Sequence, residues 1–391
     1  MKQRSHIPVL VALGLALMLP PFAIDLYLPG LPSMAQALNA SLSQAEATIA
    51  LFLVSFAVGQ LLTGAVIDSL GRRRTMIAGL VLFSAASALA AITDTMAALF
   101  ALRLLQAAGL ATTVGALPIV RDLLGADRSK AAISWIMAGV VIAPLLAPIA
   151  GGALTALFGW RSLFTALAIL GLAAVLLISL TVPASTAPAP QLRLKDLTAG
   201  YITILADDRI MRPVASAALA FGALFAFVTA APSIYMVQYG ASPSAFGVLF
   251  GANACAMLLA NLANTHLVRE LTSSTIIKMG TLLMTISTLS LCGLLFVEPP
   301  LWLLVGTIFM HFIGIGLVET NAAIQALSVS PSHNGAVAAL FGAGQFGVGA
   351  LASSVVSSGF LPPLVSVTAI MTSAVLGIIV LNAAATAKGT A

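Results

Sequence analysis

Two residues of opposite charge, Asp25 and Arg103, lie inside long apolar segments of this sequence. A charged side chain at the centre of a bilayer costs at least about 2.5–3.5 kcal/mol, so each is expected to face a partner or a water-filled cavity. Both lie nearer the outer end of their segments. At 1.5 Å of rise per residue, their depths below the outer membrane surface agree within about 5 Å. The two side chains can therefore meet if their helices are neighbours.

The chemistry of this pair suits proton coupling. A carboxyl group in a membrane can bind and release a proton, because burial favours its neutral form and a nearby cation favours its charged form. We therefore predict Asp25 as the proton-coupling residue and Arg103 as its charge partner in a cavity. The alternatives are an Asp25 carboxylate that sits in headgroup water at a helix end, and an Arg103 in a buried pair that only fixes helix packing.

Glu319 and His311 are further titratable candidates in the tenth apolar segment. Glu319 is the reserve candidate for proton coupling, although it can simply reach the inner interface. His311 lies near the middle of the segment, and histidine is a residue that titrates near neutral pH. The alternative is a packing residue held by a hydrogen bond, as is common for a lone histidine in a helix. Apart from Asp25, Arg103 and Glu319, no acidic or basic residue is expected clearly inside an apolar segment.

The composition places these residues in a membrane protein. Of the 391 residues, 60% are hydrophobic and 7% are charged, and the mean hydropathy is +1.09, whereas a soluble domain carries about 25% charged residues. The net charge of +5 comes from basic residues scattered over several loops, so no nucleic-acid partner is expected. Cys255 and Cys292 lie in apolar segments and are expected to be free thiols.

Twelve apolar segments follow one another along the chain, each long enough to cross a bilayer as a helix of about 20 residues. They fall near 7–29, 44–66, 75–94, 96–118, 131–157, 161–182, 212–238, 244–268, 275–297, 300–326, 334–358 and 362–385. A stretch richer in proline, alanine and charge separates the sixth from the seventh. The sequence thus predicts an all-α membrane protein with twelve transmembrane helices in two six-helix halves, residues 1–185 and 212–391, joined by a cytoplasmic linker over 186–211 with one short surface helix.

The basic residues predict the orientation. With both termini in the cytoplasm, all but two of the 17 Lys and Arg residues fall on the cytoplasmic side, where basic residues of short loops are retained. The exceptions are Arg103, inside a segment, and Arg161, on the outer side. The reverse orientation, or an odd number of helices, would scatter the basic residues over both faces.

A short charged loop joins the second and third segments, with the sequence G-A-V-I-D-S-L-G-R-R-R over residues 64–74. Its glycines allow close approach of the backbone, and its aspartate can lie against a helix N-terminus or pair with an arginine. The spacing resembles the signature G-x-x-x-D-x-x-G-R-R of the major facilitator superfamily. The resemblance implies conformational gating by Gly64, Asp68, Gly71, Arg72 and Arg73. A solvated basic turn that only sets topology is the alternative.

Further motifs extend this resemblance over essentially the whole chain. Residues 103–109, R-L-L-Q-A-A-G, look like the superfamily motif R-x-x-Q-G-x-G, and Pro148, Gly151 and Gly152 fit its antiporter signature G-P-x-x-G-G. Three further stretches, residues 25–32 (D-L-Y-L-P-G-L-P), 121–122 (R-D) and 316–322 (G-L-V-E-T-N-A), together resemble the Bcr/CflA branch of drug:proton antiporters, which includes bicyclomycin and chloramphenicol exporters. The resemblance implies a monomeric exporter of small lipophilic antibacterial drugs in a bacterial inner membrane, coupled to protons and without a cofactor.

In a transporter of two six-helix halves, the substrate site is expected near the middle of the bilayer. The candidate cavity residues are aromatic or polar: Tyr27, Gln106, Phe225, Tyr235, His311, Glu319 and Gln345. Helix packing or lipid contact is the alternative for the aromatic ones. Interhelical hydrogen bonds are the default interpretation for Gln345 and for Asn253, Asn261 and Asn264.

Other functional classes fit the sequence less well. It contains no H-E-x-x-H, C-x-x-C or phosphate-binding G-x-x-x-x-G-K-[ST] motif, so we expect neither an enzyme nor a metal site nor ATP-driven pumping by this chain. Nothing suggests the filter loop of a channel. Among transporters, an exporter or importer of an endogenous metabolite such as a sugar or amino acid is the main rival.

Overall fold

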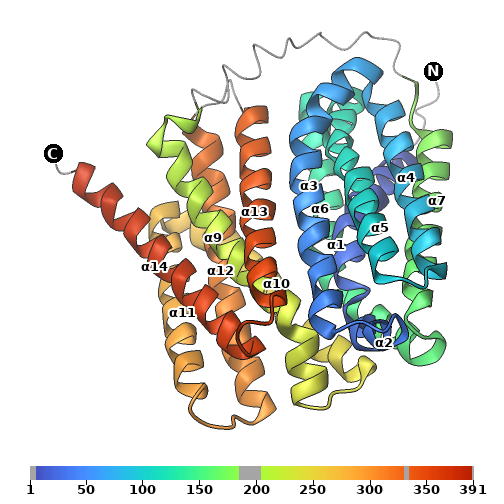
Figure 1. Cartoon of the computed structure of the whole chain (residues 1–391). Helices are drawn as coiled ribbons and strands as arrows, with labels where there is room; N and C mark the ends of the chain where they lie inside the picture. Colours follow the sequence, from blue (N-terminus) through green and yellow to red (C-terminus); the bar gives the residue numbers. More distant parts are fainter. Residues whose placement is uncertain (1–5, 185–203, 330–333, 390–391) are drawn as a thin grey trace. The chain divides into compact units, whose positions relative to one another are not determined.

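The computed structural model describes residues 6–184, 204–329 and 334–389, and the regular structure of these residues is entirely helical. Twelve helices in this part of the chain are long and apolar enough to cross a membrane (Figure 1). The twelve predicted segments are therefore confirmed as helices. Most of the linker predicted at 186–211, with its surface helix, lies outside the described residues.

The helices of the N-terminal part are connected by short turns. They are α1 (Ile7–Asp25), the 3-10 turn η1 (Leu28–Gly30), α2 (Leu31–Ala37), α3 (Leu42–Leu70), α4 (Arg72–Ile92), α5 (Met96–Leu110), the 3-10 turn η2 (Ala111–Gly115), α6 (Ala116–Phe158) and α7 (Arg161–Thr181).

The C-terminal part contains a π-helical segment that directly continues its first long helix. Its elements are α9 (Asp208–Ala231), the π-helix η3 (Pro232–Gln238), α10 (Pro243–Glu270), α11 (Ser273–Leu294), α12 (Leu301–Val329), α13 (Asn334–Ser357) and α14 (Pro363–Gly389).

Helix α6 corrects one expectation from the sequence. The fourth and fifth segments were expected to be separated by a loop over about 118–131, but α6 is helical on both sides of a single break at Gly125, which has φ 74° and ψ 173°. Arg121, Arg128 and Lys130 therefore lie on helix rather than in a loop. Charged residues end the apolar stretch without ending the helix, whereas the positive φ of Gly125 suits a residue without Cβ.

The described chain forms two compact units. The first comprises Met1–Ser41, Ser55–Arg193 and Pro243–Gly247, and the second comprises Leu42–Val54, Leu194–Ser242 and Val248–Ala391. The first unit comes mostly from the N-terminal half of the sequence and the second mostly from the C-terminal half. The start of α3 nevertheless packs within the second unit, and the start of α10 packs within the first.

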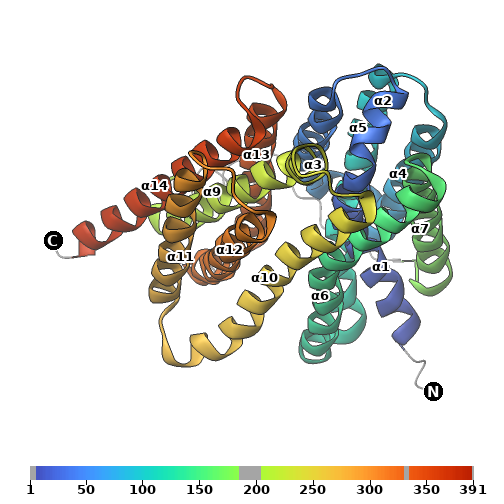
Figure 2. The same ribbon diagram turned by 90° about the horizontal axis from the view of Figure 1, so that it is seen from below.

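Each unit has its own helix packing. In the first, α4 packs against α5 and α7, and α1 packs against α6 and α7. In the second, α9 is surrounded by α12, α13 and α14 (Figure 2), and 83% of the most apolar window of its span is buried. The central position of α9 explains why this span has so little surface to offer to lipid.

A glycine pair brings two helices into backbone contact in each unit. A Cβ atom at Gly79 of α4 would overlap the carbonyl oxygen of Gly109 of α5, and a Cβ at Gly109 would overlap that of Gly79. In the second unit, α11 and α12 meet in the same way, since a Cβ at Gly314 would lie 2.6 Å from the carbonyl oxygen of Gly280. Small residues at such crossings allow the close van der Waals packing that holds membrane helices together.

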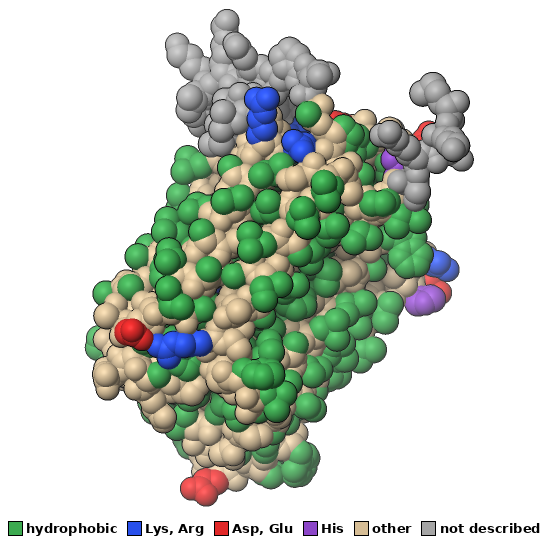
Figure 3. Space-filling view, turned by 90° about the vertical axis from the view of Figure 1, so that its right-hand side faces the viewer, with side chains coloured by type: hydrophobic (Ala, Val, Ile, Leu, Met, Phe, Trp, Pro, Cys, Tyr) green, Lys and Arg blue, Asp and Glu red, His purple; other side chains and the backbone are tan. Residues whose placement is uncertain are grey.

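The surface is apolar where a soluble protein would be charged. Figure 3 shows hydrophobic side chains spread over one face with few charged side chains among them. On α7, Ile169, Leu172, Leu176 and Leu180 are between 56% and 75% exposed. Their helical spacing places them on one stripe, which is the pattern of a lipid-facing surface.

The glycine crossing of α11 and α12 gives a first prediction. Gly314→Ala should lower the thermal unfolding temperature of the purified protein, because overpacking a tight contact costs about 1–3 kcal/mol. Gly306→Ala on the same helix is the matched control, since its new Cβ would have no neighbour within 4 Å. Equal melting temperatures for the two variants would contradict a packing role for Gly314.

Candidate functional site

Arg103 on α5 is fully buried, and its guanidinium is held by groups of the first unit. Nη1 donates to the carbonyl oxygen of Ala23 on α1 and to Oε1 of Gln106, both at 3.0 Å. Gln106 Nε2 donates to Ser87 Oγ on α4 at 2.7 Å, and Ser87 donates to the carbonyl oxygen of Phe83 at 2.7 Å. A buried chain of hydrogen bonds thus joins α1, α5 and α4.

Tyr27 covers the guanidinium of Arg103. Its ring centroid lies 4.3 Å from the Arg103 Cζ, within cation–π distance, and the side chain is only 1% exposed. Phe164 of α7 packs against the Tyr27 ring with centroids 6.0 Å apart. The structure therefore brings together three of the predicted site residues: Tyr27, Arg103 and Gln106.

Asp25 is the last residue of α1 and is 7% exposed. Among the described residues, no ion pair joins its carboxylate to Arg103, whose guanidinium instead contacts the backbone two residues earlier, at Ala23. Asp25 and Arg103 thus lie in the same region of the first unit without being paired.

The antiporter signature of α6 is a close-packing surface. A Cβ at Gly151 would overlap the carbonyl oxygen of Leu26, directly after α1, and a Cβ at Gly152 would overlap the carbonyl oxygen of Pro243, the first residue of α10. Any larger residue would have to push these backbone segments away.

The contact between α6 and the start of α10 is reciprocal. A Cβ at Gly247 of α10 would overlap the carbonyl oxygen of Pro148. Pro148, Gly151 and Gly152 therefore share one role in the first unit, which is to let α6 approach neighbouring backbone without intervening side chains.

The arginines of the predicted gating loop bind two other helices. Arg72 Nη1 pairs with the Asp122 carboxylate of α6, and Arg73 Nη2 donates to the carbonyl oxygen of Ser179 on α7 at 2.8 Å. The loop expected over residues 64–74 is therefore corrected: α3 runs to Leu70 and α4 begins at Arg72, so only Gly71 lies between the two helices.

The glycines and aspartate of this loop are only partly described. Gly71 caps the start of α4 with φ 82°, a backbone conformation that favours glycine. Gly64 and Asp68 lie on the backbone of α3, but their side-chain environment lies outside the described part of the structure. The gating role of these residues stays a prediction.

Phe225 of α9 belongs to an aromatic cluster in the second unit. Its ring lies 4.9 Å from that of Phe221, which lies 5.2 Å from that of Phe346 on α13. Phe225 is 5% exposed. The cluster offers an apolar, polarisable surface, as a site for lipophilic ligands requires, and it also packs α9 against α13.

Tyr235 lies in the π-helix η3 and is fully buried. Asn253 Nδ2 of α10 donates to its hydroxyl at 2.7 Å, and its ring lies 5.7 Å from that of Phe227. A π-helical turn is rare and often marks a functional site.

Glu319 and Gln345 are direct partners. Gln345 Nε2 of α13 donates to Glu319 Oε1 of α12 at 2.7 Å, and both side chains are partly buried. On the same helix, Asn321 Nδ2 donates to Asn264 Oδ1 of α10, also at 2.7 Å.

Asn261 completes these cross-helix contacts, because Thr320 Oγ1 of α12 donates to its Oδ1 at 2.7 Å. The interhelical hydrogen bonds predicted for Asn253, Asn261, Asn264 and Gln345 are therefore all confirmed.

His311 is fully buried on α12. Its Nδ1 lies 2.7 Å from Ser287 Oγ of α11, which also donates to the carbonyl oxygen of Met284 at 2.9 Å. Within the described residues Nε2 has no hydrogen-bond partner. When the Ser287 hydroxyl donates its proton to the Met284 carbonyl, its oxygen can only accept from His311. Nδ1 must then carry the imidazole proton, and Nε2 is left as an acceptor.

Glu46 is a buried acid that the sequence analysis missed. It lies in the second turn of α3, is 3% exposed, and accepts a hydrogen bond from Ser233 Oγ of η3 at 2.5 Å. The expectation that Asp25, Arg103 and Glu319 are the only acidic or basic residues clearly inside the apolar segments was therefore wrong. Glu46 was overlooked because it lies close to the start of its apolar segment, where a charge is usually interfacial.

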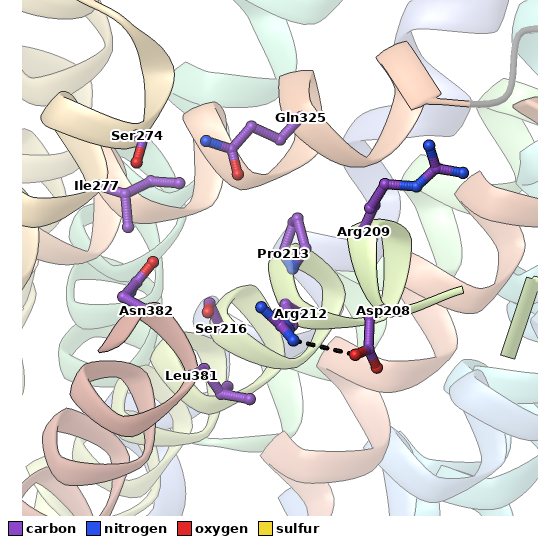
Figure 4. Close-up of a pocket in the computed structure, with 10 residues that line it drawn as sticks. All are labelled: Asp208, Arg209, Arg212, Pro213, Ser216, Ser274, Ile277, Gln325, Leu381 and Asn382. Atoms are coloured by element: carbon purple, nitrogen blue, oxygen red, sulfur yellow. Dashed lines mark hydrogen bonds and ion pairs between the residues drawn. The ribbon is translucent and has the colours of Figure 1, made fainter. Parts of the chain in front are cut away.

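A pocket of about 470 Å³ opens among α9, α11, α12 and α14 of the second unit (Figure 4). At its edge Arg212 pairs with Asp208 at 3.0 Å, and Ser216, Ser274 and Asn382 supply further polar groups. The pocket contains none of the predicted site residues, so its lining does not support the predicted substrate site.

The sequence of this chain is similar to one protein family along most of its length. The family model of the Major Facilitator Superfamily matches residues 13–354. A bicyclomycin resistance protein homolog of Haemophilus influenzae is 29% identical over 362 residues, covering 91% of this chain and 90% of that protein. The uncharacterized MFS-type transporter YdgK of Bacillus subtilis is 30% identical over 87% of this chain and 86% of its own.

A more local similarity is higher in identity. The multidrug resistance protein MdtL of Escherichia coli is 39% identical over 174 residues, covering 44% of each chain. Among solved structures, a peptide transporter POT in complex with sulfate superposes with a TM-score of 0.76 at 16% identity, covering 96% of this chain and 94% of the other. At that identity the structural likeness shows the fold alone.

The network around Arg103 gives a second prediction. Arg103→Lys should lower the unfolding temperature, because an ammonium cannot replace the planar fork that reaches Ala23 and Gln106, and a lost hydrogen bond to a charged group costs about 1.5–3 kcal/mol. Arg161→Lys is the matched control: that guanidinium stacks over Trp160 at 4.4 Å and pairs with the exposed Asp94. Comparable losses in both variants would contradict a special role for the buried network.

Proposed function

This chain belongs to the Major Facilitator Superfamily, and on that premise we propose that it exports small lipophilic antibacterial compounds in exchange for protons. It is a multi-pass protein of a bacterial inner membrane with twelve membrane-crossing helices. The exported compounds are proposed to resemble chloramphenicol or bicyclomycin. The two termini are proposed to lie in the cytoplasm, as the distribution of basic residues requires.

The observation that carries the proposal is the similarity to a bicyclomycin resistance protein homolog along 91% of the chain. The similarity to a multidrug resistance protein over 174 residues points to the same class of substrate and fits the predicted Bcr/CflA branch. The substrate is thus a small molecule that leaves chemically unchanged, and neither catalysis nor a cofactor is needed. The working unit is proposed to be the monomer.

Proton coupling requires a group whose proton affinity differs between two states of the cycle, because coupling is a difference in binding free energy. A permanently charged group cannot supply this difference. Asp25 is the proposed proton carrier, since it is a nearly buried carboxyl at the end of α1. Glu319, bonded to Gln345, and the buried His311 remain reserve candidates.

Arg103 is proposed to supply a fixed positive charge near this carboxyl. Its hydrogen bond to the Ala23 carbonyl places the guanidinium beside the last turn of α1. A small movement between α5 and the end of α1 would change how strongly the charge acts on Asp25 or on an electron-rich group of the substrate. Tyr27 and Gln106, which hold the guanidinium, are proposed cavity residues of the first unit.

The second unit is proposed to contribute an apolar binding surface. Phe225 with its aromatic neighbours offers stacking partners for a lipophilic drug, and Tyr235 adds a hydroxyl that is bonded to Asn253. Gly64, Asp68, Gly71, Arg72 and Arg73 are proposed to control the conformational change.

Transport of an endogenous metabolite is the rival proposal. The structural likeness to a peptide transporter does not favour it, since a likeness at 16% identity concerns the fold. Competition in inverted membrane vesicles separates the two: drugs should compete with one another for transport, and a sugar or amino acid that displaced them would favour the rival.

The decisive experiment for the proposed function measures drug accumulation in cells with and without the protein, and with and without a protonophore. Expression should lower accumulation, and the protonophore should abolish the difference. An effect of expression that survives the protonophore would contradict proton coupling, and no effect on any drug would contradict drug export.

Purified protein in detergent then tests Asp25 as the proton carrier. Adding drug to the wild type at fixed pH should release protons, because drug binding and proton binding oppose each other. Asp25→Asn should still bind drug but release none. Undiminished release from this variant would place the coupling residue elsewhere.

A further inference from the structure

Glu46 occupies an unusual environment for a carboxylate. It is 3% exposed. One turn away on α3, Ile49 and Ala50 are buried and apolar, and Ser43 is polar and partly buried. Its one hydrogen-bond donor among the described residues is Ser233 of η3, at 2.5 Å. A carboxylate has about four acceptor positions, so a single donor leaves most of them unused.

Among the residues that the structure describes, no cation pairs with this carboxylate. Within the described residues, no Lys, Arg or His nitrogen lies within 4.0 Å of Glu46. The titratable group on the facing element η3 is Tyr235, whose hydroxyl is bonded to Asn253. The turn after α13 approaches the start of α3 at Gly359 and carries no ionisable side chain. A buried charge without a partner is costly, and a proton on the carboxyl removes that cost.

The place of Glu46 in the fold makes this environment changeable. The start of α3, Leu42–Val54, packs within the second unit, whereas α3 from Ser55 onward belongs to the first. The helix therefore passes from one unit to the other along its length. In a transporter whose halves move against each other, such a segment must part from its neighbours or bend during the cycle.

The partner of Glu46 also lies on an irregular element. Ser233 is the second residue of the π-helix η3, which begins at Pro232. A π-turn interrupts the regular hydrogen-bond ladder, and proline supplies no backbone N–H to it. The hydroxyl of Ser233 is thus presented by a segment that can rearrange more easily than a regular helix.

We propose that Glu46 is a second proton-binding carboxyl of the transport cycle, protonated while bonded to Ser233 and deprotonated once the start of α3 separates from η3 and water reaches it. In the bonded state Oε1 accepts from Ser233 and Oε2 carries the proton. On separation the O–H bond of the acid breaks, the proton passes to water, and the carboxylate is hydrated. The inference rests on the proposed proton-coupled export.

The test measures the separation of α3 from η3 directly, in the full-length protein in detergent. Cys255 and Cys292 are replaced by alanine, and Ile49→Cys, fully buried and three residues from Glu46, reports access by its rate of alkylation with a maleimide. The rate is divided by that of an exposed reference, Ser358→Cys. Maleimide reaches the cysteine at position 49 only in the separated state, where its thiol is in water, so the ratio cancels the pH dependence of thiol ionisation.

With Glu46 intact, the ratio should rise about tenfold between about pH 5.5 and 8.5. This is the change expected if Glu46 binds its proton about tenfold more tightly in the bonded state than in the separated state. Glu46→Gln keeps an acceptor for Ser233 but cannot ionise, so its ratio should stay low at every pH. Glu298→Gln, which removes an exposed carboxyl, is the matched control and should behave as the unmodified protein.

A pH step that survives Glu46→Gln, or a flat profile with Glu46 intact, would overturn the proposal. If Glu46→Gln does not fold, Ser233→Ala decides: it removes the donor but keeps the carboxyl, so the ratio at low pH should rise, and an unchanged profile would overturn the proposal. The measurement uses no drug, whereas the proposed function fails on accumulation and protonophore sensitivity, so the two failures are distinguishable.

Discussion

A permanent positive charge inside an apolar helix bundle can be accommodated only by polar groups of the bundle itself, and around Arg103 these include the Ala23 carbonyl and the Gln106 side chain, which both accept from Nη1. Helix α1 ends at Asp25, so the carbonyl groups of its last turn lack helical partners. The carbonyl of Phe22 accepts the N–H of Leu26, and that of Ala23 accepts Arg103. The Ala23 carbonyl and Nη1 of Arg103 thus satisfy each other, and the negative end of the helix dipole favours the cation.

This arrangement bears on the proton coupling proposed for Asp25. Because the guanidinium is bonded to the backbone of α1 rather than to the carboxylate of Asp25, the carboxylate is left able to gain or lose a proton without breaking the contact that holds α5 to α1. A direct ion pair would fix Asp25 in its charged form. Tyr27 and Gln106 keep the cation in position through the ring contact and the hydrogen bond.

Hydropathy and the spacing of a few residues predicted much of the molecule. The twelve helices follow from runs of apolar residues, because a bilayer permits few other ways to satisfy the backbone. The pairing of Arg103 with Gln106 was not predicted, although a spacing of three residues on one helix permits it. The contact with the Ala23 carbonyl was not predictable, because it depends on where α1 stops. The helical continuation to Gly125 was also missed, since apolar character marks the membrane and not the helix end.

Glu46 shows a different limit of sequence reasoning. Its neighbours in sequence suggest an interfacial residue, and only the packing of Leu42–Val54 within the second unit buries it. The start of α10 is the counterpart, since it packs within the first unit against Gly152 and Pro148. Residues 243–247, which make that second contact, carry no ionisable side chain. The starts of α3 and α10 each pack in a different unit from the rest of their helix. At the start of α3, the contact between Glu46 and Ser233 can depend on a proton. A proton gradient can therefore act on the start of α3 and has no corresponding group at the start of α10.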